Sequence, residues 1–125
     1  MGGTGPATFR LINETRGCEL GDRIEVVRSF VGRGRGLMFR RSLEPGAGMV
    51  IDPCSSIHTI GMRFPIDVLY MDREQRVVRV DQAMPPWRIG PLRPGPGSRY
   101  VVELPAGVIQ ASGTRPGDRL RLLPG

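Results

Sequence analysis

The sequence predicts a mainly β (α+β) fold: a small antiparallel β-barrel or sandwich with one short helix and a long Pro/Gly-rich loop. Seven or so short stretches have the two-residue period of strands and are separated by turn residues. The 18 glycines and 12 prolines favour many turns over long helices. A length of 125 residues suits one domain. We therefore expect a single domain over residues 1–125, with a flexible N-terminus at 1–6.

The clearest expected strand covers residues 64–71, where Ile66, Val68 and Tyr70 fall on one face. The connection DREQ joins it to a strand at 76–81, so the two should form a hairpin. The other expected strands cover residues 7–12, 23–30, 47–51, 57–62, 98–105 and 119–123.

The segments between these strands carry the helical and loop patterns. One or two helical turns are expected between Leu37 and Pro45, starting late because glycine weakens a helix interior. Residues 13–22 read as a loop or hairpin connection, and 106–113 as a helical turn. The long loop at 83–97 contains the only tryptophan, and loops of this length often bind ligands.

The ordered motifs GLMFRRSLEPGAGMV, SIHTIGMRFPIDVLYMD, VVELPAG and PGDRL resemble the family called domain of unknown function 192. The resemblance covers a core of residues 33–122 and implies a small, mainly antiparallel β fold with no settled biochemical activity. Gln75 stands where the hairpin loop of this family tends to have glycine, so strain is expected there. The positions that the resemblance marks out are Gly36, Leu37, Arg40, His58, Pro65, Asp67, Glu103, Gly107, Gly117 and Asp118.

The stretch at 52–72 holds the candidate site, because it contains the only histidine, His58, and a carboxylate, Asp67, inside an apolar run. A buried carboxylate needs a partner. One interpretation pairs Asp67 with Arg40, with Arg63 or with loop N–H groups.

The other interpretation places Asp67 with His58 and Glu103 around a cleft that the 83–97 loop covers. His58 would then act as a general base, with Trp87 over the ligand. His58 and Asp67 are thus the candidate catalytic residues, and Arg40, Glu103 and Trp87 complete the candidate binding set.

A metal site has weaker support. Cys54, His58 and Met62 lie four residues apart, and their soft side chains suit Cu(I). In an extended strand, however, the outer two would lie ~26 Å apart. The alternative places Cys54 and Met62 in the core. The cofactor is left unknown.

The charge pattern bears on partners. The net charge is +6, all 18 basic residues are arginine, and one cluster gathers Arg33, Arg35, Arg40 and Arg41. This cluster could contact RNA, but the pattern favours a solvated helix face or loop whose guanidiniums pair with carboxylates. No hydrolase motif is present, and GRGRG lacks the lysine of a phosphate loop.

These observations favour a small-ligand binding module with a polar pocket near residues 54–67. The alternatives are an enzyme that uses His58 with a carboxylate, and an RNA or protein adaptor that uses the arginine cluster. No apolar run reaches the ~20 residues that span a bilayer, and the N-terminus lacks the pattern of a signal peptide. We therefore expect a cytoplasmic protein without a membrane partner.

Overall fold

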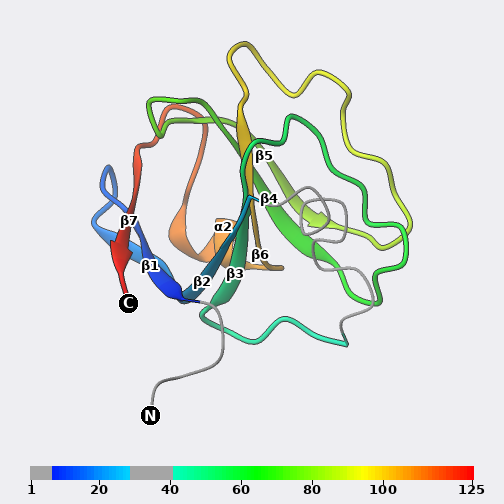
Figure 1. The fold of residues 1–125 in the computed structure, drawn as a ribbon, viewed down its shortest axis with the longest axis horizontal. Coiled ribbons are helices and arrows are strands. Elements are labelled where there is room, and N and C mark those ends of the chain that lie inside the picture. Colours follow the sequence, from blue (N-terminus) through cyan, green and yellow to red (C-terminus); the bar gives the residue numbers. More distant parts are fainter. Residues whose placement is uncertain (1–6, 29–40) are drawn as a thin grey trace.

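In the computed structural model, which describes residues 7–28 and 41–125, seven strands form one sheet in the order β5-β4-β6-β3-β2-β1-β7. The sheet curls into a half-barrel around the short helix α2 (Figure 1). The elements are β1 (Thr8–Asn13), β2 (Cys18–Val27), β3 (Ala47–Ile51), β4 (Ile66–Met71), β5 (Val77–Met84), β6 (Tyr100–Pro105), α2 (Val108–Ser112) and β7 (Leu120–Pro124). The predicted fold class is confirmed.

The pairing is antiparallel throughout except between β2 and β3, which run parallel. A parallel pair requires a connection that brings the chain back to the end of the sheet at which the first strand begins, and residues 28–46 are long enough for this. The sequence did not indicate this pair, because strand period alone says nothing about direction.

Two edges of the sheet meet at one end. Leu120 N donates to Gln75 O at 2.9 Å, Val77 N donates to Asp118 O at 2.9 Å, and Gly117 N donates to Val77 O at 2.7 Å. These bonds join the first residues of β5 to the segment that leads into β7. Within residues 7–28 and 41–125, the two edge strands are therefore tied at this end only.

The core has one cluster on each face of the sheet. Leu69, Val102 and Leu104 belong to the inner cluster, which Ile109 of α2 also joins. Ile66 and Val68 belong to the outer cluster, which the loop residues after β3 cover. The alternation predicted for residues 64–71 therefore places successive side chains in different clusters.

Three local features bear on the predicted loops and strands: residues 18–22, residues 57–62 and Gln75. Residues 18–22 belong to β2 rather than to a loop, because the turn at Gly17, with φ of 67°, is tight. Residues 57–62 form no strand, only a bridge between His58 and Ile89. Gln75 has φ of 65°, in the left-handed region, as its departure from glycine predicted.

The predicted helical turns between Leu37 and Pro45 fall mainly outside the described residues. Residues 41–44, which are described, are not helical. The helical turn predicted at 106–113 is confirmed as α2. No helix of the described part of the chain is long and apolar enough to cross a membrane.

Candidate functional site

Asp67, on β4, has a fully buried carboxylate whose hydrogen bonds come from the backbone. Its Oδ1 accepts from Ala83 N at 2.8 Å, and its Oδ2 accepts from Gly107 N at 3.1 Å and from Ile109 N at 2.8 Å. The side chain is 0% exposed. The partners found are backbone N–H groups, but Ala83 lies in β5 and Ile109 in α2 rather than in loops, and the predicted partner Arg40 lies outside the described residues. Asp67 therefore connects β4 to the end of β5 and to the start of α2.

The structure does not bring Asp67 and Glu103 around one cleft. Asp67 is paired with Leu104 across the β4–β6 ladder, and Glu103 is paired with Val68. Directly opposed residues of an antiparallel pair share a face. Asp67 therefore lies on the face of Leu104, in the inner cluster, whereas Glu103 lies on the face of Val68, in the outer cluster.

His58 lies apart from Asp67. It is exposed, and its Nδ1 accepts from Ile60 N at 3.2 Å. Its neighbours Ile57 and Met62 pack in the outer cluster, on the other side of the sheet from the Asp67 carboxylate. An acid–base pair of these two side chains lacks the shared cleft that it requires.

Trp87 does not cover a cleft either, since 65% of its surface is exposed. Its backbone is held by a bond from Trp87 N to Thr59 O at 2.9 Å. Of the predicted arginine cluster, Arg33, Arg35 and Arg40 lie outside the described residues, and Arg41 is exposed.

The three residues weighed as metal ligands have separate surroundings. Met62 is 2% exposed in the outer cluster, and the Cys54 thiol donates to Ser56 O at 2.8 Å. His58 faces outward. Within residues 7–28 and 41–125, no three His, Cys, Asp or Glu side chains are grouped so that they could hold a metal ion.

A hollow of about 570 Å³ does lie beside the N-terminal end of the predicted pocket. It is wide open, and its polar lining includes the side chains of Arg73 and Arg99. Neither His58 nor Asp67 lines it. The complete lining is Pro53, Cys54, Ser55, Arg73, Gly97, Ser98 and Arg99.

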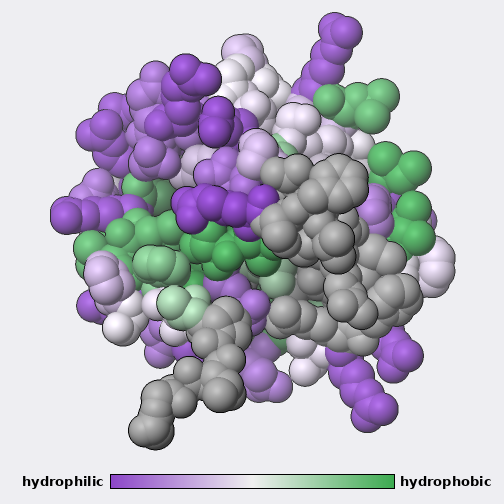
Figure 2. All heavy atoms as spheres, in the orientation of Figure 1, coloured by the Kyte–Doolittle hydropathy of each residue, from purple (hydrophilic) through white to green (hydrophobic). Residues whose placement is uncertain are grey.

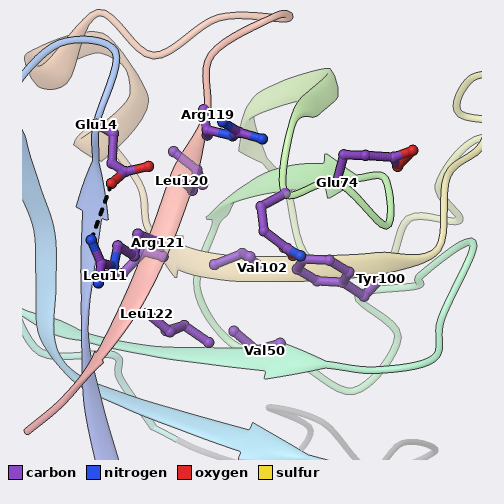
Figure 3. Close-up of a pocket in the computed structure, with 11 residues that line it drawn as sticks. Leu11, Glu14, Val50, Glu74, Tyr100, Val102, Arg119, Leu120, Arg121 and Leu122 are labelled. Atoms are coloured by element: carbon purple, nitrogen blue, oxygen red, sulfur yellow. Dashed lines mark hydrogen bonds and ion pairs between the residues drawn. The ribbon is translucent and has the colours of Figure 1, made fainter.

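A second concavity, which the sequence analysis missed, lies at the mouth of the half-barrel, beside β7 (Figure 3). We call this concavity of about 510 Å³ the mouth groove. Its floor is apolar and consists of Leu11, Val50, Val102, Leu120 and Leu122. Its rim is polar and consists of Glu14, Glu74, Gln75, Tyr100, Arg119 and Arg121.

The mouth groove exists because β7 is an edge strand. Among the described residues, β7 is tied to the start of β5 only near Leu120, so the edge of the inner cluster is left partly exposed at Leu122, further along the strand. Four of the floor residues are almost fully buried and Leu122 is half-buried. Figure 2 shows the result as a band of hydrophobic atoms between polar ones on the side of β7.

The rim contains paired and unpaired charges. Arg121 Nη1 lies 3.6 Å from Glu14 Oε2. The guanidinium of Arg119 forms no ion pair with a carboxylate of the described residues, and Figure 3 shows its side chain extending over the opening. The rim therefore offers one positive charge that a ligand could neutralise.

Tyr100 closes the rim on the side of β6. Its hydroxyl donates to Gln75 Oε1 at 2.7 Å. Burial, followed by the charges of Asp52 and Asp72, raises the pKa of Tyr100 to about 12. The phenol therefore remains a neutral donor across the physiological range of pH.

Sequence reasoning missed the mouth groove because its floor residues look like ordinary core positions. They come from four strands, β1, β3, β6 and β7, that are widely separated along the chain, and only the curl of the sheet brings them together. The fold and this groove define a small half-barrel domain with an apolar mouth.

Comparison with known proteins agrees with that class. The sequence profile of the family described as domain of unknown function 192, an uncharacterized ACR, matches residues 12–122, and the chain belongs to this family. A UPF0127 protein of Pyrococcus furiosus is 33% identical over 120 residues, which cover 88% of this chain and 95% of that protein.

Two solved structures have a similar fold. A protein of unknown function from Novosphingobium aromaticivorans has a TM-score of 0.81 at 23% identity, with 94% of this chain and 87% of that chain covered. A protein of Sinorhizobium meliloti that is provisionally described as a transcription regulator has a TM-score of 0.78 at 27% identity, with 96% and 98% covered.

Proposed function

We propose that this protein is a small-ligand binding module and that its ligand lies in the mouth groove rather than beside His58. The observation that carries the proposal is a concavity of about 510 Å³ with an apolar floor, in which Leu122 is half-buried and Val50 and Val102 lie at the bottom. Concave apolar sites with a few convergent polar groups are the usual form of small-molecule sites.

The lining indicates the chemistry of the ligand. An apolar portion would pack over Val50 and Val102 and against Leu122, and would remove the exposed surface of Leu122 from water. An anionic group at the rim would meet Arg119, which has no carboxylate partner among the described residues, and the neutral hydroxyl of Tyr100 lies across the opening. The proposed class is therefore a small carboxylic acid with an aliphatic or aromatic body.

Thermal stabilisation by a homologous series of aliphatic carboxylic acids tests this proposal. Each added methylene should tighten binding about fourfold, since burial of one CH₂ contributes ≈ 0.8 kcal/mol. The matched alcohols should bind more weakly, because they cannot neutralise Arg119. Ligands that bind only the folded state raise the midpoint of unfolding in proportion to the logarithm of their concentration.

Two neighbouring residues of β7 provide a matched pair of variants. Leu122 lines the mouth groove, whereas Leu123 is the next residue of the strand and so points to the opposite face. Leu122→Ser should remove the stabilisation by the acids, and Leu123→Ser should keep it. Equal loss in both variants, or no dependence on chain length, would refute the mouth groove as the ligand site.

A further inference from the structure

A separate feature of the molecule, independent of the mouth groove, is a row of exposed apolar side chains. Ile60, Trp87, Ile89 and Leu92 have exposed fractions of 38%, 65%, 72% and 84%. We call these four residues the apolar ridge. They come from the two loops that Figure 1 draws on the right, and Figure 2 shows hydrophobic atoms projecting at that edge.

The backbone beneath the apolar ridge is firmly held. Trp87 N donates to Thr59 O at 2.9 Å, and Gly90 N donates to Ile57 O at 2.8 Å. Thr59, which is 0% exposed, also donates through its hydroxyl to Pro85 O at 2.6 Å. The exposed side chains are therefore presented by an anchored pair of loops.

The backbone conformation of Trp87 indicates that the exposure of the apolar ridge has a function. Trp87 has φ of 62°, a backbone conformation that bulky side chains rarely adopt. Strain of this kind persists where the surrounding structure imposes it, and it often marks binding sites. Here it accompanies a large aromatic side chain that is directed into solvent and makes no use of the core.

The two segments that carry the apolar ridge have charges of one sign only. Residues 53–66 and 82–102, which contain the whole ridge, include no aspartate or glutamate. Arg63, Arg88 and Arg93 lie within these segments, and all three are exposed. The surface therefore combines projecting apolar groups with positive charges that no acidic residue of the same segments offsets.

We propose that the apolar ridge binds the surface of an anionic lipid bilayer, with its apolar side chains among the headgroups and its arginines on the lipid phosphates. Tryptophan is favoured at the level of the headgroups, and each basic residue near an anionic surface strengthens binding. The sequence predicted no membrane partner because no segment can span a bilayer, but surface binding requires no span.

A bilayer suits this surface better than a protein partner does. Arg63, Arg88 and Arg93 are interspersed with the apolar ridge along the chain, whereas the centre of a protein interface is depleted of charged residues. A second copy of the chain is also disfavoured, because a symmetric contact through the apolar ridge would bring positively charged segments of both copies together with no acidic residue of the same segments between them.

The single tryptophan of the chain makes the test direct, since it is Trp87 itself. The full chain is mixed with vesicles of phosphatidylcholine, with or without phosphatidylglycerol, and both tryptophan emission and co-sedimentation are measured. We expect a blue shift and co-sedimentation with the anionic vesicles only, and binding that weakens as salt is added.

Variants separate the contributions of charge and apolar insertion. Arg93→Gln should weaken binding about fivefold, which corresponds to about 1 kcal/mol per basic residue at an anionic surface. Leu92→Ser should weaken binding and reduce the blue shift. Arg10→Gln removes the same charge from β1, where Arg10 pairs with Glu19 at 2.6 Å, and should leave binding close to wild type.

Each other result overturns the proposal. The absence of binding to either vesicle would leave the apolar ridge to a protein partner. Equal binding to both vesicles, or equal weakening by Arg93→Gln and Arg10→Gln, would show that the ridge does not recognise an anionic bilayer.

Discussion

Replacement of Asp67 by asparagine should destabilise the fold strongly, although it changes one heavy atom. The carboxylate accepts hydrogen bonds from Ala83 N, Gly107 N and Ile109 N, at 2.8, 3.1 and 2.8 Å. An asparagine in the same position has one acceptor oxygen and one NH₂ group, which is only a donor. At least one of the three N–H groups would then face another donor.

The size of the effect follows from these contacts. In the better orientation, the asparagine oxygen keeps the two bonds to Gly107 N and Ile109 N, and Ala83 N loses its partner. The loss of one hydrogen bond to a charged group costs about 1.5–3 kcal/mol of stability. The other two bonds become weaker, because their acceptor is now a neutral amide oxygen. We therefore expect Asp67→Asn to lower the free energy of unfolding by about 2–4 kcal/mol.

Urea denaturation monitored by circular dichroism measures this change as a lower midpoint at unchanged slope. Asp22→Asn is the control, because the Asp22 side chain is 58% exposed and its ion pair is a long one, with 3.6 Å between Asp22 Oδ1 and Arg23 Nε. It should change the free energy of unfolding by less than about 0.5 kcal/mol. A loss below about 0.5 kcal/mol for Asp67→Asn would refute the structural role assigned to its carboxylate.

Three further predictions concern other parts of the molecule. Burial alone would raise the pKa of Asp118, but hydrogen bonds from Asn13, Arg16 and the backbone of Arg115 hold it below its usual value. The stability that Asp118 contributes is therefore fully present above the pKa that this carboxyl has in the unfolded chain, and it is lost as pH falls through the lower pKa of the folded state. The urea midpoints of wild type and Asp118→Asn should converge in acid, and a constant difference between them would contradict this. Since the pKa of Tyr100 is raised to about 12, its stabilising effect should fade as pH rises from about 10 to 12. Burial also raises the pKa of Tyr70, the other tyrosine, so spectrophotometric titration should find no tyrosinate step near 10 in the folded protein. Gly48→Ala should cost about 1–3 kcal/mol by thermal denaturation, because its Cβ would lie 2.9 Å from Glu103 O; an unchanged midpoint would mean that the sheet yields there.

The strands were predictable wherever one short period dominates the sequence. Residues 47–51 match β3 fully, and 64–71 contain β4 with its faces assigned as found. The parallel pairing of β2 with β3 was not predictable, because it depends on how the chain returns across the sheet. The same limit applied to residues 57–62, whose backbone bonds go to the loop at 87–90 instead of to a strand.

The candidate site was predictable only as a set of unusual residues. The sequence correctly singled out Asp67 as a buried carboxylate that needs a partner, but it could not tell which of three donors would be present. Assignment of Asp67 and Glu103 to opposite faces required the register of the β4–β6 ladder. The mouth groove depends on the curl of the whole sheet, and no local pattern encodes that curl.

The most direct test of the ligand proposal is a map of methyl chemical shifts during titration with an aliphatic carboxylic acid. If the ligand lies in the mouth groove, the methyl groups of Val50, Val102 and Leu122 should shift together and saturate with one dissociation constant, while those of Ile57 and Ile60, beside His58, should stay unchanged. Saturable shifts confined to Ile57 and Ile60 would place the ligand beside the histidine and contradict a ligand site in the mouth groove.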